Sequence, residues 1–373
     1  MRASKIVNYT NNTTQLFTVG DSIITGINNS NLQFIKYGLF AQISKTYLAN
    51  TLSSSFGLRI DGNSFTKSTN STNLSPRLSL AYNINSKTSI NTNIGRFHQL
   101  PSYTILGFEN NGNYLNKDAS YISCDHAVLG IEYNPSSYSK ITLESFYKSY
   151  NNYPFSILDS ISLANLGDEF GVIGNEDISS ISKGNSYGFE LLAQQKMSSS
   201  IYGILSATYY FSRFEDKDGN LISSSWDNRF ILNMTAGKKF KKNWEIGVKF
   251  RFSGGSPYTP FDTLNSSYIQ VWDVANMGLL DYNQLNELRL KANHGLDIRI
   301  DKKWYWKKMA LNLYLDIQNA YNFQSETAPS LIVPTDDNGN RLINSNDPSR
   351  YQTKLIENVS GTLLPSIGLQ FEF

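Results

Sequence analysis

The chain has little of what enzymes and nucleic-acid-binding proteins use. Its 373 residues include a single cysteine, Cys124, which excludes an internal disulfide, and only three histidines. Charged residues make up 17% of the chain, below the roughly 25% of an average soluble domain. The net charge of +2 gives no reason to expect nucleic acid as a partner. Apolar runs are only a few residues long, which excludes a transmembrane helix.

Residues that could build a catalytic or metal site are equally sparse. His98, His126 and His294 lie far apart and lack the spacing of metal ligands. No histidine pattern supports Cys124 as a nucleophile, so we interpret it as a small packing residue. Residues 216–220 and 336–340 superficially resemble calcium loops, but the ligand spacing is wrong and turn formation explains them better. We therefore expect no enzymatic activity, no metal site and no cofactor.

What the chain does have is a repeated alternation of apolar and polar residues. In residues 244–252 the apolar positions are Trp244, Ile246, Val248, Phe250 and Phe252, and the intervening positions are glycine or charged. Because successive side chains of a β-strand point to opposite faces, each such strand has one apolar and one charged face. In a soluble sandwich the apolar face would lie inside, whereas in a membrane barrel it faces lipid and the charged face lines the lumen.

The connections between these strands fall into two lengths that alternate along the chain. About 14 strands of roughly ten residues are predicted, a length that suits a tilted transmembrane strand, with the first near residues 15–28. Short connections are predicted near residues 45–49, 85–88, 134–139, 196–200, 238–243 and 302–308. Long ones are predicted near residues 62–75, 99–124, 153–185, 214–225, 254–293 and 325–362. This alternation predicts an all-β, antiparallel up-and-down barrel with short periplasmic turns and long extracellular loops.

Other features agree with a membrane barrel. The mean hydropathy of −0.34 does not exclude one, because every second strand residue is polar. Aromatic residues near predicted strand ends suit interfacial girdles: Tyr82, Tyr133, Trp244, Trp304 and Trp306. The lysine-rich stretches 238–242 and 302–308 lie in predicted tight turns, where solvated lysines are the simplest explanation. If Leu313 faces lipid near mid-bilayer, Leu313→Arg should cost about 2–4 kcal/mol, whereas Asn312→Arg in the lumen should be nearly silent.

Several segments, in order along the chain, resemble the C-terminal barrel of TonB-dependent outer-membrane receptors of the type common in Bacteroidota. They are residues 74–82, 95–103, 147–154, 186–190, 225–232, 243–247, 252–260 and 314–322. The most specific are Ser-Trp-Asp-Asn-Arg-Phe-Ile-Leu at 225–232 and Asn-Trp-Glu-Ile-Gly at 243–247. The last strand, with Leu369, Phe371 and the terminal Phe373, resembles the closing strand that the barrel assembly machinery reads.

The resemblance implies that residues 1–373 form one outer-membrane β-barrel domain of a Gram-negative bacterium. Such receptors have about 22 strands and a plugged lumen, so this chain would be the distal part of the barrel. The family's plug, TonB-contact segment and signal peptide are not visible in the sequence. The implied function is import of a scarce nutrient (an iron chelate, a corrinoid or a glycan) when the barrel is joined to its plug.

The implied partners are outer-membrane lipid, the barrel assembly machinery and a small nutrient ligand, with TonB reached only through the absent N-terminal region. Two alternatives stay open. The chain could be a stand-alone porin-like diffusion channel, since about 14 is an allowed even number of strands. It could also be a soluble or surface β-protein that binds a partner.

Two sets of residues are candidates for a functional site. Aromatic residues in the long loops are candidates for ligand contact, because loops on a rigid scaffold often carry binding residues: Tyr114, Tyr121, Tyr258, Tyr268 and Trp272. Charged residues on the polar strand faces are predicted to line the lumen and mostly to pair with one another: Arg59, Arg96, Glu132, Glu144, Glu190, Lys249, Arg251, Asp297 and Arg299.

Overall fold

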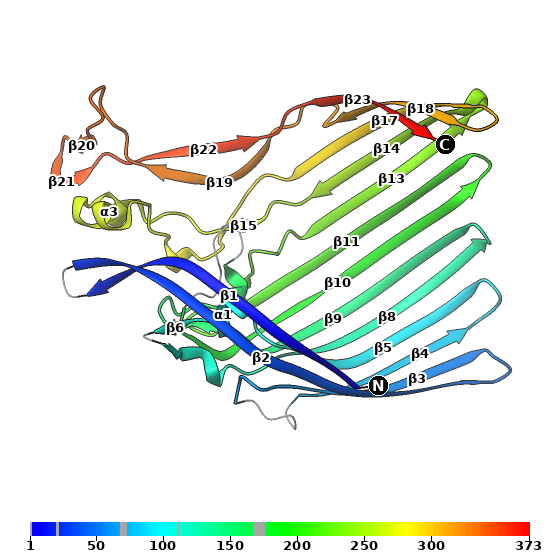
Figure 1. Cartoon of the computed structure of the whole chain (residues 1–373), viewed down its shortest axis with the longest axis horizontal. Coiled ribbons are helices and arrows are strands. Elements are labelled where there is room, and N and C mark those ends of the chain that lie inside the picture. The colour runs from blue at the N-terminus through cyan, green and yellow to red at the C-terminus, as the bar shows by residue number, and fades with distance from the viewer. Residues whose placement is uncertain (1, 20–21, 68–72, 111, 167–175) are drawn as a thin grey trace.

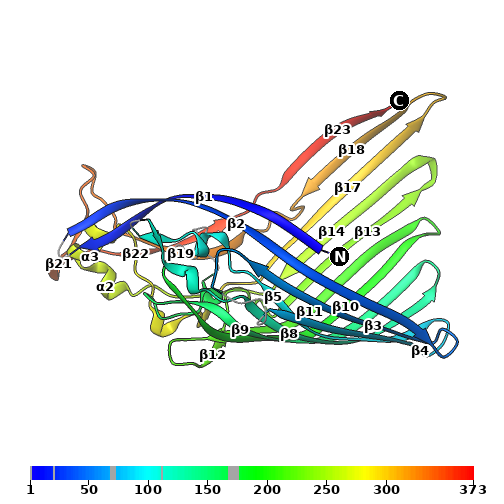
Figure 2. The same cartoon turned by 60° about the horizontal axis from the view of Figure 1, so that its bottom comes forward.

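The protein is built around one curved antiparallel sheet. The computed structural model describes residues 2–19, 22–67, 73–110, 112–166 and 176–373 (Figure 1). Fourteen strands follow one another in sequence order, each hydrogen-bonded to the next. They are β1 (Arg2–Val19), β2 (Ser22–Tyr47), β3 (Leu52–Asn63), β4 (Leu74–Asn83), β5 (Thr88–Gln99), β8 (Ile122–Ser136), β9 (Ser139–Ser156), β10 (Ile178–Ser198), β11 (Ile201–Glu215), β13 (Phe230–Phe240), β14 (Trp244–Ser253), β17 (Asn293–Tyr305), β18 (Ala310–Gln318) and β23 (Leu364–Glu372). Figure 2 shows that the sheet curves from β1 to β23.

The predicted strand number is confirmed, but the predicted position of the first strand is wrong. Residues 15–28 span the end of β1 and the start of β2, which pair as a hairpin from Arg2 opposite Leu39 to Val19 opposite Ser22. Residues 8–15 are mostly Asn and Thr, so they carry no apolar alternation from which β1 could be recognised. Among the described residues β1 pairs only with β2, and β23 pairs only with β18.

The predicted alternation of short and long connections is confirmed. In Figure 1 the short turns lie at the right of the sheet, and the loop helices and small hairpins lie at the left. Between β10 and β11 only Ser199 and Ser200 turn the chain, with φ of 48° and 69°. Two successive left-handed residues match the right-handed twist of the flanking strands, as in a type I′ hairpin. We call the two ends of the sheet the turn end and the loop end.

The long connections carry the remaining elements. These are α1 (Tyr103–Leu106), α2 (Thr263–Ser267), α3 (Ile269–Ala275), η2 (Leu115–Asp118), η3 (Leu163–Asn165), η5 (Tyr282–Gln284) and β12 (Leu221–Ser223), with η4 (Lys241–Asn243) in a turn. Small hairpins pair β6 (Glu109–Asn110) with β7 (Asn113–Tyr114), β15 (Pro257–Tyr258) with β16 (Leu288–Arg289), β19 (Ser325–Ile332) with β22 (Lys354–Ser360), and β20 (Ile343–Asn344) with β21 (Asp347–Tyr351). In the described part of the chain no helix is long and apolar enough to cross a bilayer.

The strand register brings the predicted apolar faces together into one continuous surface. One row of directly paired residues runs across seven strands: Phe56, Leu78, Ile94, Ala127, Tyr147, Tyr187 and Phe211. The large side chains of this face are exposed, for example Ile43, Ile94 and Phe189 at 71%, 59% and 60%. An apolar surface of this extent is unfavourable in water and matches a lipid environment. We call it the outer face and the opposite one the lumen face.

Aromatic side chains mark both edges of the outer face. At the turn end the five predicted girdle residues are exposed: Tyr82, Tyr133, Trp244, Trp304 and Trp306. Toward the loop end the rings of Tyr147, Tyr187 and Phe211 stack, with centroids 6.4 Å and 5.1 Å apart. Amphipathic rings prefer the membrane interface, so the strand residues between these two levels lie in the hydrocarbon.

The structure corrects the contrast predicted for Leu313 and Asn312. Leu313 is on the outer face, but it lies opposite Lys302, whose Nζ is 5.3 Å and 5.5 Å from the ring centroids of Trp244 and Trp304. Leu313 is therefore near the interface, where an arginine could reach the headgroups and would cost little. Asn312 is 4% exposed and donates its Nδ2 to Asp301 at 2.8 Å, so Asn312→Arg would not be silent.

Candidate functional site

The long connections pack against one another at the loop end. A cluster of buried apolar side chains joins β2 to the connections that follow β5 and β9: Leu32, Phe34, Leu100, Ile105, Leu106, Ala119, Tyr121, Leu163 and Ile178. Phe65, from the β3–β4 connection, packs against this cluster and makes an edge-on contact with Tyr114 at 5.2 Å. Burial of these side chains gives the described parts of the loops a core of their own, so they form a fixed surface above the sheet.

The same cluster accounts for two of the predicted ligand-contact residues. Tyr121 is 3% exposed, and its hydroxyl accepts a hydrogen bond from Asn63 Nδ2 at 3.2 Å. The hydroxyl of Tyr114 donates to the backbone oxygen of Asn31 at 2.6 Å. Burial raises the pKa of the Tyr114 hydroxyl, which stays a donor at neutral pH. Both side chains pack the loops in this arrangement, and their contact with a ligand stays a prediction.

The other three candidates lie in the β14–β17 connection. Trp272 on α3 is 5% exposed and packs inside the loop. Tyr268, at the junction of α2 and α3, stacks with the Arg350 guanidinium at 4.5 Å and accepts from its Nη2 at 2.8 Å. Tyr258 lies on β15, opposite Leu288 of β16. Tyr258 and Tyr268 are half-buried and keep surface that a ligand could touch, so for these two the prediction is geometrically open.

A buried carboxylate clamps two neighbouring loops together. Asp227 is fully buried, and its Oδ2 lies 3.0 Å from Arg229 Nε and 3.0 Å from Arg289 Nη2. Arg289 also donates to the backbone oxygen of Asp227 at 2.5 Å. Nearby, the backbone oxygen of Asn165 accepts from Ser225 Oγ at 2.6 Å and from Asn286 Nδ2 at 3.0 Å. The Asp227 clamp thus fixes the β11–β13 and β14–β17 connections to each other and to η3.

The clamp was not predicted from the sequence, although two of its three residues lie in a segment that carries the family resemblance. Asp227 and Arg229 belong to segment 225–232, which carries the family resemblance, but nothing in the sequence pairs them with Arg289. Asn228, between Asp227 and Arg229, donates from its Nδ2 to Ser253 Oγ at 2.7 Å and to the backbone oxygen of Gly254 at 3.2 Å. Segments 225–232 and 252–260 are therefore joined at the loop end of β13 and β14. These hydrogen bonds hold the start of β13 to the first residues of the loop that follows β14.

Gly255 is required at this joint because the backbone of Leu290 approaches it closely. A Cβ built on Gly255 would lie 1.7 Å from the Leu290 carbonyl oxygen, whereas one on Gly247 would meet nothing within 4 Å. We expect Gly255→Ala to destabilise the folded protein by about 1–3 kcal/mol through overpacking, and Gly247→Ala to have almost no effect. A urea refolding titration of both variants measures the difference. Equal stabilities would mean that the joint is not tightly packed.

A polar hollow of about 660 Å³ lies beside the Asp227 clamp. Its lining includes Arg229 and Arg289 of the clamp and polar residues from the two flanking connections: Asp216, Lys217, Asp218, Tyr282, Asn283 and Glu287. At the rim of the hollow, Lys217 Nζ donates to Asn283 Oδ1 at 2.8 Å and so joins the two flanking connections. Charges of both signs and amide groups suit a polar ligand held by hydrogen bonds rather than an apolar one.

Most of the predicted lumen charges lie on the lumen face and have partners there. Ion pairs join Arg59 to Asp61, Glu132 to Lys140, Arg251 to Asp297 and Arg299 to Asp301, at 2.5, 2.5, 3.1 and 2.9 Å. Lys249 is directly opposite Asp297, whereas Glu144 and Glu190 are directly opposite each other and carry the same charge. The pairing limits how much charge the lumen offers to a passing solute, and a role in conduction stays a prediction.

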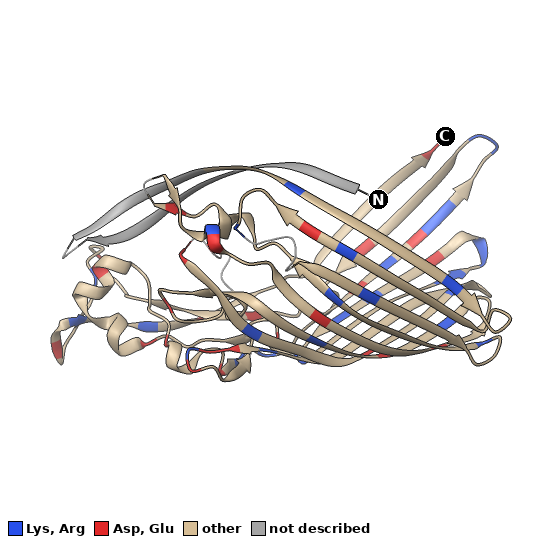
Figure 3. Cartoon of the chain, turned by 90° about the horizontal axis from the view of Figure 1, so that it is seen from below, with Lys and Arg blue, Asp and Glu red and all other residues tan. Residues whose placement is uncertain are grey.

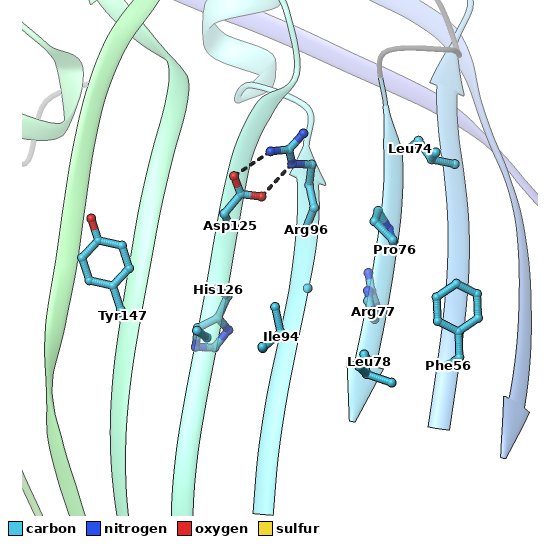
Figure 4. A pocket seen from close by; sticks show the side chains of 12 residues that line it. Phe56, Leu74, Pro76, Arg77, Leu78, Ile94, Arg96, Asp125, His126 and Tyr147 are labelled. Carbon is cyan, nitrogen blue, oxygen red and sulfur yellow. Dashed lines mark hydrogen bonds and ion pairs between the residues drawn. The ribbon is translucent and has the colours of Figure 1, made fainter. Parts of the chain in front are cut away.

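Arg96 is the exception, and the prediction that it faces the lumen is wrong. β5 pairs with β8 without a bulge from Ile94 to Arg96, so Arg96 lies on the same outer face as Ile94. Its Nε and Nη2 donate to Asp125 at 2.6 Å and 2.7 Å, as Figure 4 shows. The pair lines a shallow outer-face hollow of about 680 Å³ and lies two residues closer to the loop end than Ile94 and Ala127. The level is that of the headgroups, where a paired charge is tolerated.

The histidines and the acidic turns show no metal-binding geometry. Among the described residues, no three or more His, Cys, Asp or Glu side chains are placed to hold a metal ion. In the 336–340 turn, Asp336 Oδ1 accepts from the backbone N–H groups of Asn338 and Asn340 at 2.9 Å and 2.8 Å. Hydrogen bonds from the Asn340 side chain and from the turn's backbone lower the pKa of Asp336 below its usual value. The carboxylate is used to form the turn.

The C-terminal strand places its three predicted signal residues on the outer face. Leu369 and Phe371 are paired with Leu313 and Leu311, and Phe373 is 96% exposed at the turn end. Exposed aromatic and aliphatic side chains at the end of a free strand edge are accessible to another protein. Recognition by the assembly machinery stays a prediction.

Comparison with known proteins agrees with this architecture. A family model described as TonB dependent receptor-like, beta-barrel matches residues 2–320. No curated protein matches the sequence. Among solved structures, the ferripyoverdine receptor of Pseudomonas aeruginosa is similar with a TM-score of 0.59 at 11% identity, over 94% of this chain and 40% of that one.

Two structures from Escherichia coli are similar over almost the whole chain. The ferric-catecholate import receptor Fiu has a TM-score of 0.57 at 11% identity, over 99% of this chain and 55% of that one. The outer membrane transporter YddB has a TM-score of 0.57 at 12% identity, over 98% of this chain and 55% of that one. These likenesses show the fold, and this chain spans only about half the length of the proteins it matches.

Proposed function

Because this chain belongs to the TonB-dependent receptor-like β-barrel family, whose members lie in the outer membrane of Gram-negative bacteria, we propose that it is the distal part of a nutrient importer's barrel. The observation that carries the proposal is the pairing of a lipid-facing sheet with loops that pack into a fixed outer surface. The sheet holds the surface in the membrane, and the surface offers polar hollows to a ligand. The family is one of receptors and transporters, and we propose that the chain has no enzymatic activity.

We propose that the ligand is scarce and polar: an iron chelate, a corrinoid or a glycan. The hollow beside the Asp227 clamp supports a polar ligand through its mixed charges and amides. Iron chelates are the first class to test, because the ferripyoverdine receptor and the ferric-catecholate import receptor are among the similar structures. We further propose a plug and a TonB-contact segment in the complete protein, assembly by the barrel assembly machinery, and a source among Bacteroidota.

The free edges of the sheet support a barrel larger than 14 strands. In the described residues β1 and β23 each have one partner, and further strands between them would close such a barrel. A porin-like channel of 14 strands would instead need β1 to pair with β23. The interpretation as a soluble or surface β-protein is overturned by membership of an outer-membrane family.

Uptake by cells tests the proposal. Labelled iron chelate, corrinoid and oligosaccharide would each be supplied to cells with the natural gene and to cells without it, with and without a protonophore. We expect one class to accumulate only in cells that carry the gene, and only while the proton gradient is intact. Accumulation that resists the protonophore would indicate passive diffusion and would contradict energised import.

A further inference from the structure

Two neighbouring hairpins at the turn end are unusually rich in lysine. Residues 238–243 and 302–308 contain eight lysines and no acidic residue: Lys238, Lys239, Lys241, Lys242, Lys302, Lys303, Lys307 and Lys308. The hairpins are β13–β14 and β17–β18, and they are adjacent because β14 pairs with β17. Figure 3 shows both hairpin ends in blue. We call these eight residues the lysine patch.

Four lysines of the patch are held by neighbours on the strands. On the lumen face Lys239 is 3.9 Å from Glu245, and Lys303 is 3.6 Å from Glu372. On the outer face Lys238 lies over the ring of Phe240 at 5.3 Å. Lys302 lies between Trp244 and Trp304 and donates to the backbone oxygen of Lys242, which ties the two hairpins together. The patch is therefore one continuous surface rather than two separate turns.

The other four lysines form the tips of the turns and lack acidic partners. Lys241, Lys242, Lys307 and Lys308 are exposed, and within the described residues none has a carboxylate oxygen within 4.0 Å. The four remaining short turns, residues 48–51, 84–87, 137–138 and 199–200, contain one lysine altogether, Lys87. Solubility of a turn does not require this concentration, because the other turns do without it. Four uncompensated cations at the tips of two adjacent hairpins favour an anionic partner.

The position of the patch identifies that partner. Trp304 and Trp306, exposed on the outer face, mark the membrane interface beside the tips. In an outer-membrane barrel the short turns face the periplasm, so the patch is level with the headgroups of the inner leaflet, which consists of glycerophospholipids. The lysine ammonium is a compact charge suited to phosphate, and a flexible stem lets it follow a mobile headgroup.

We propose that the lysine patch binds the headgroups of anionic glycerophospholipids in the periplasmic leaflet. The site recruits phosphatidylglycerol-type lipids around β13–β18 and so fixes the depth of this side of the barrel. Clustering matters because charges interact within a Debye length of about 8 Å at physiological ionic strength, so the two consecutive lysines at each tip act together on a headgroup. This inference goes beyond the proposed function and does not depend on the nutrient that the receptor imports.

A binding titration on the natural full-length protein in neutral detergent tests the proposal. The probes are fluorescently labelled phosphatidylglycerol and phosphatidylcholine of equal chain length. The test variant combines Lys241→Gln, Lys242→Gln, Lys307→Gln and Lys308→Gln. The matched control removes four exposed lysines elsewhere: Lys87→Gln, Lys183→Gln, Lys196→Gln and Lys354→Gln.

We expect the natural protein and the control to prefer phosphatidylglycerol, and the test variant to bind it no better than phosphatidylcholine. Raising the sodium chloride concentration should abolish the preference in the natural protein, a result that needs no variant to fold. The proposal is overturned if the test variant keeps the preference, if the control loses it equally, or if the natural protein binds both lipids alike. Full displacement by an equal concentration of inorganic phosphate would indicate a small-anion site instead and would also overturn it.

Discussion

Leu205→Arg is expected to destabilise the folded protein by about 2–4 kcal/mol, whereas Thr208→Arg, three residues further along β11, is expected to cost less than about 1 kcal/mol. Leu205 is on the outer face, paired with Ala193 and Met234, and is midway between Ile201 at the turn end and Tyr209 near the loop end. An arginine there would lie in the hydrocarbon, too far from either interface to reach water easily.

Thr208 is the matched control because it is on the same strand but on the lumen face. It lies opposite Glu190, and Glu190 in turn lies opposite Glu144. An arginine at this position would be hydrated and would meet two carboxylates, so its cost should be small. Urea titration of both variants refolded into lipid vesicles measures the contrast. If the two substitutions cost the same, the assignment of the outer face to lipid is wrong.

Asp227→Ala is expected to open the loop surface, at a cost of about 3–5 kcal/mol, because it leaves two partly buried guanidinium groups without their shared carboxylate. Arg229 and Arg289 both rely on Asp227, which is fully buried. The sheet is stabilised separately by its strand pairing and by lipid. The protein should therefore still insert into membranes and keep its resistance to unfolding by detergent at room temperature.

The rate of backbone amide hydrogen exchange in residues 216–229 and 254–292 measures how far the two loops open. The control is Asp273→Ala, which removes a more exposed ion pair with Arg341 at 2.5 Å and should cost at most about 1 kcal/mol. Faster exchange confined to the two loops in Asp227→Ala, with little change in Asp273→Ala, would agree with the clamp. Unchanged exchange in Asp227→Ala would show that the loops are held by other contacts.

The strands could be predicted from the sequence because their signal is local. Alternation of the kind seen in residues 244–252 depends only on the period of two of a β-strand, and it correctly predicts that Trp244, Ile246 and Val248 share one face. The same rule applied to β5 would have placed Arg96 with Ile94 on the outer face. The charge of Arg96 suggests the lumen instead, but charge is a poor guide beyond the aromatic girdle, where the outer face itself becomes polar.

The loop surface could not be predicted because its contacts join distant parts of the chain. Arg289 meets Asp227 across 62 residues, and Asn286 meets Asn165 across 121. No short pattern records such pairs, although segment 225–232 marked one half of the clamp. The burial of Tyr121 and Trp272 has the same origin, since an aromatic residue in a loop has no local signal that separates packing from ligand contact.

The size of the native polypeptide tests the central claim most directly. An antibody against the segment β18–β23 would be applied to outer-membrane fractions of the source cells, separated by mass after complete denaturation. The account predicts a band well above the 42.0 kDa of this chain, because the proposed importer would contain a plug and further strands in addition to this chain. A band near 42.0 kDa in the outer membrane would contradict that account and favour a self-sufficient diffusion channel.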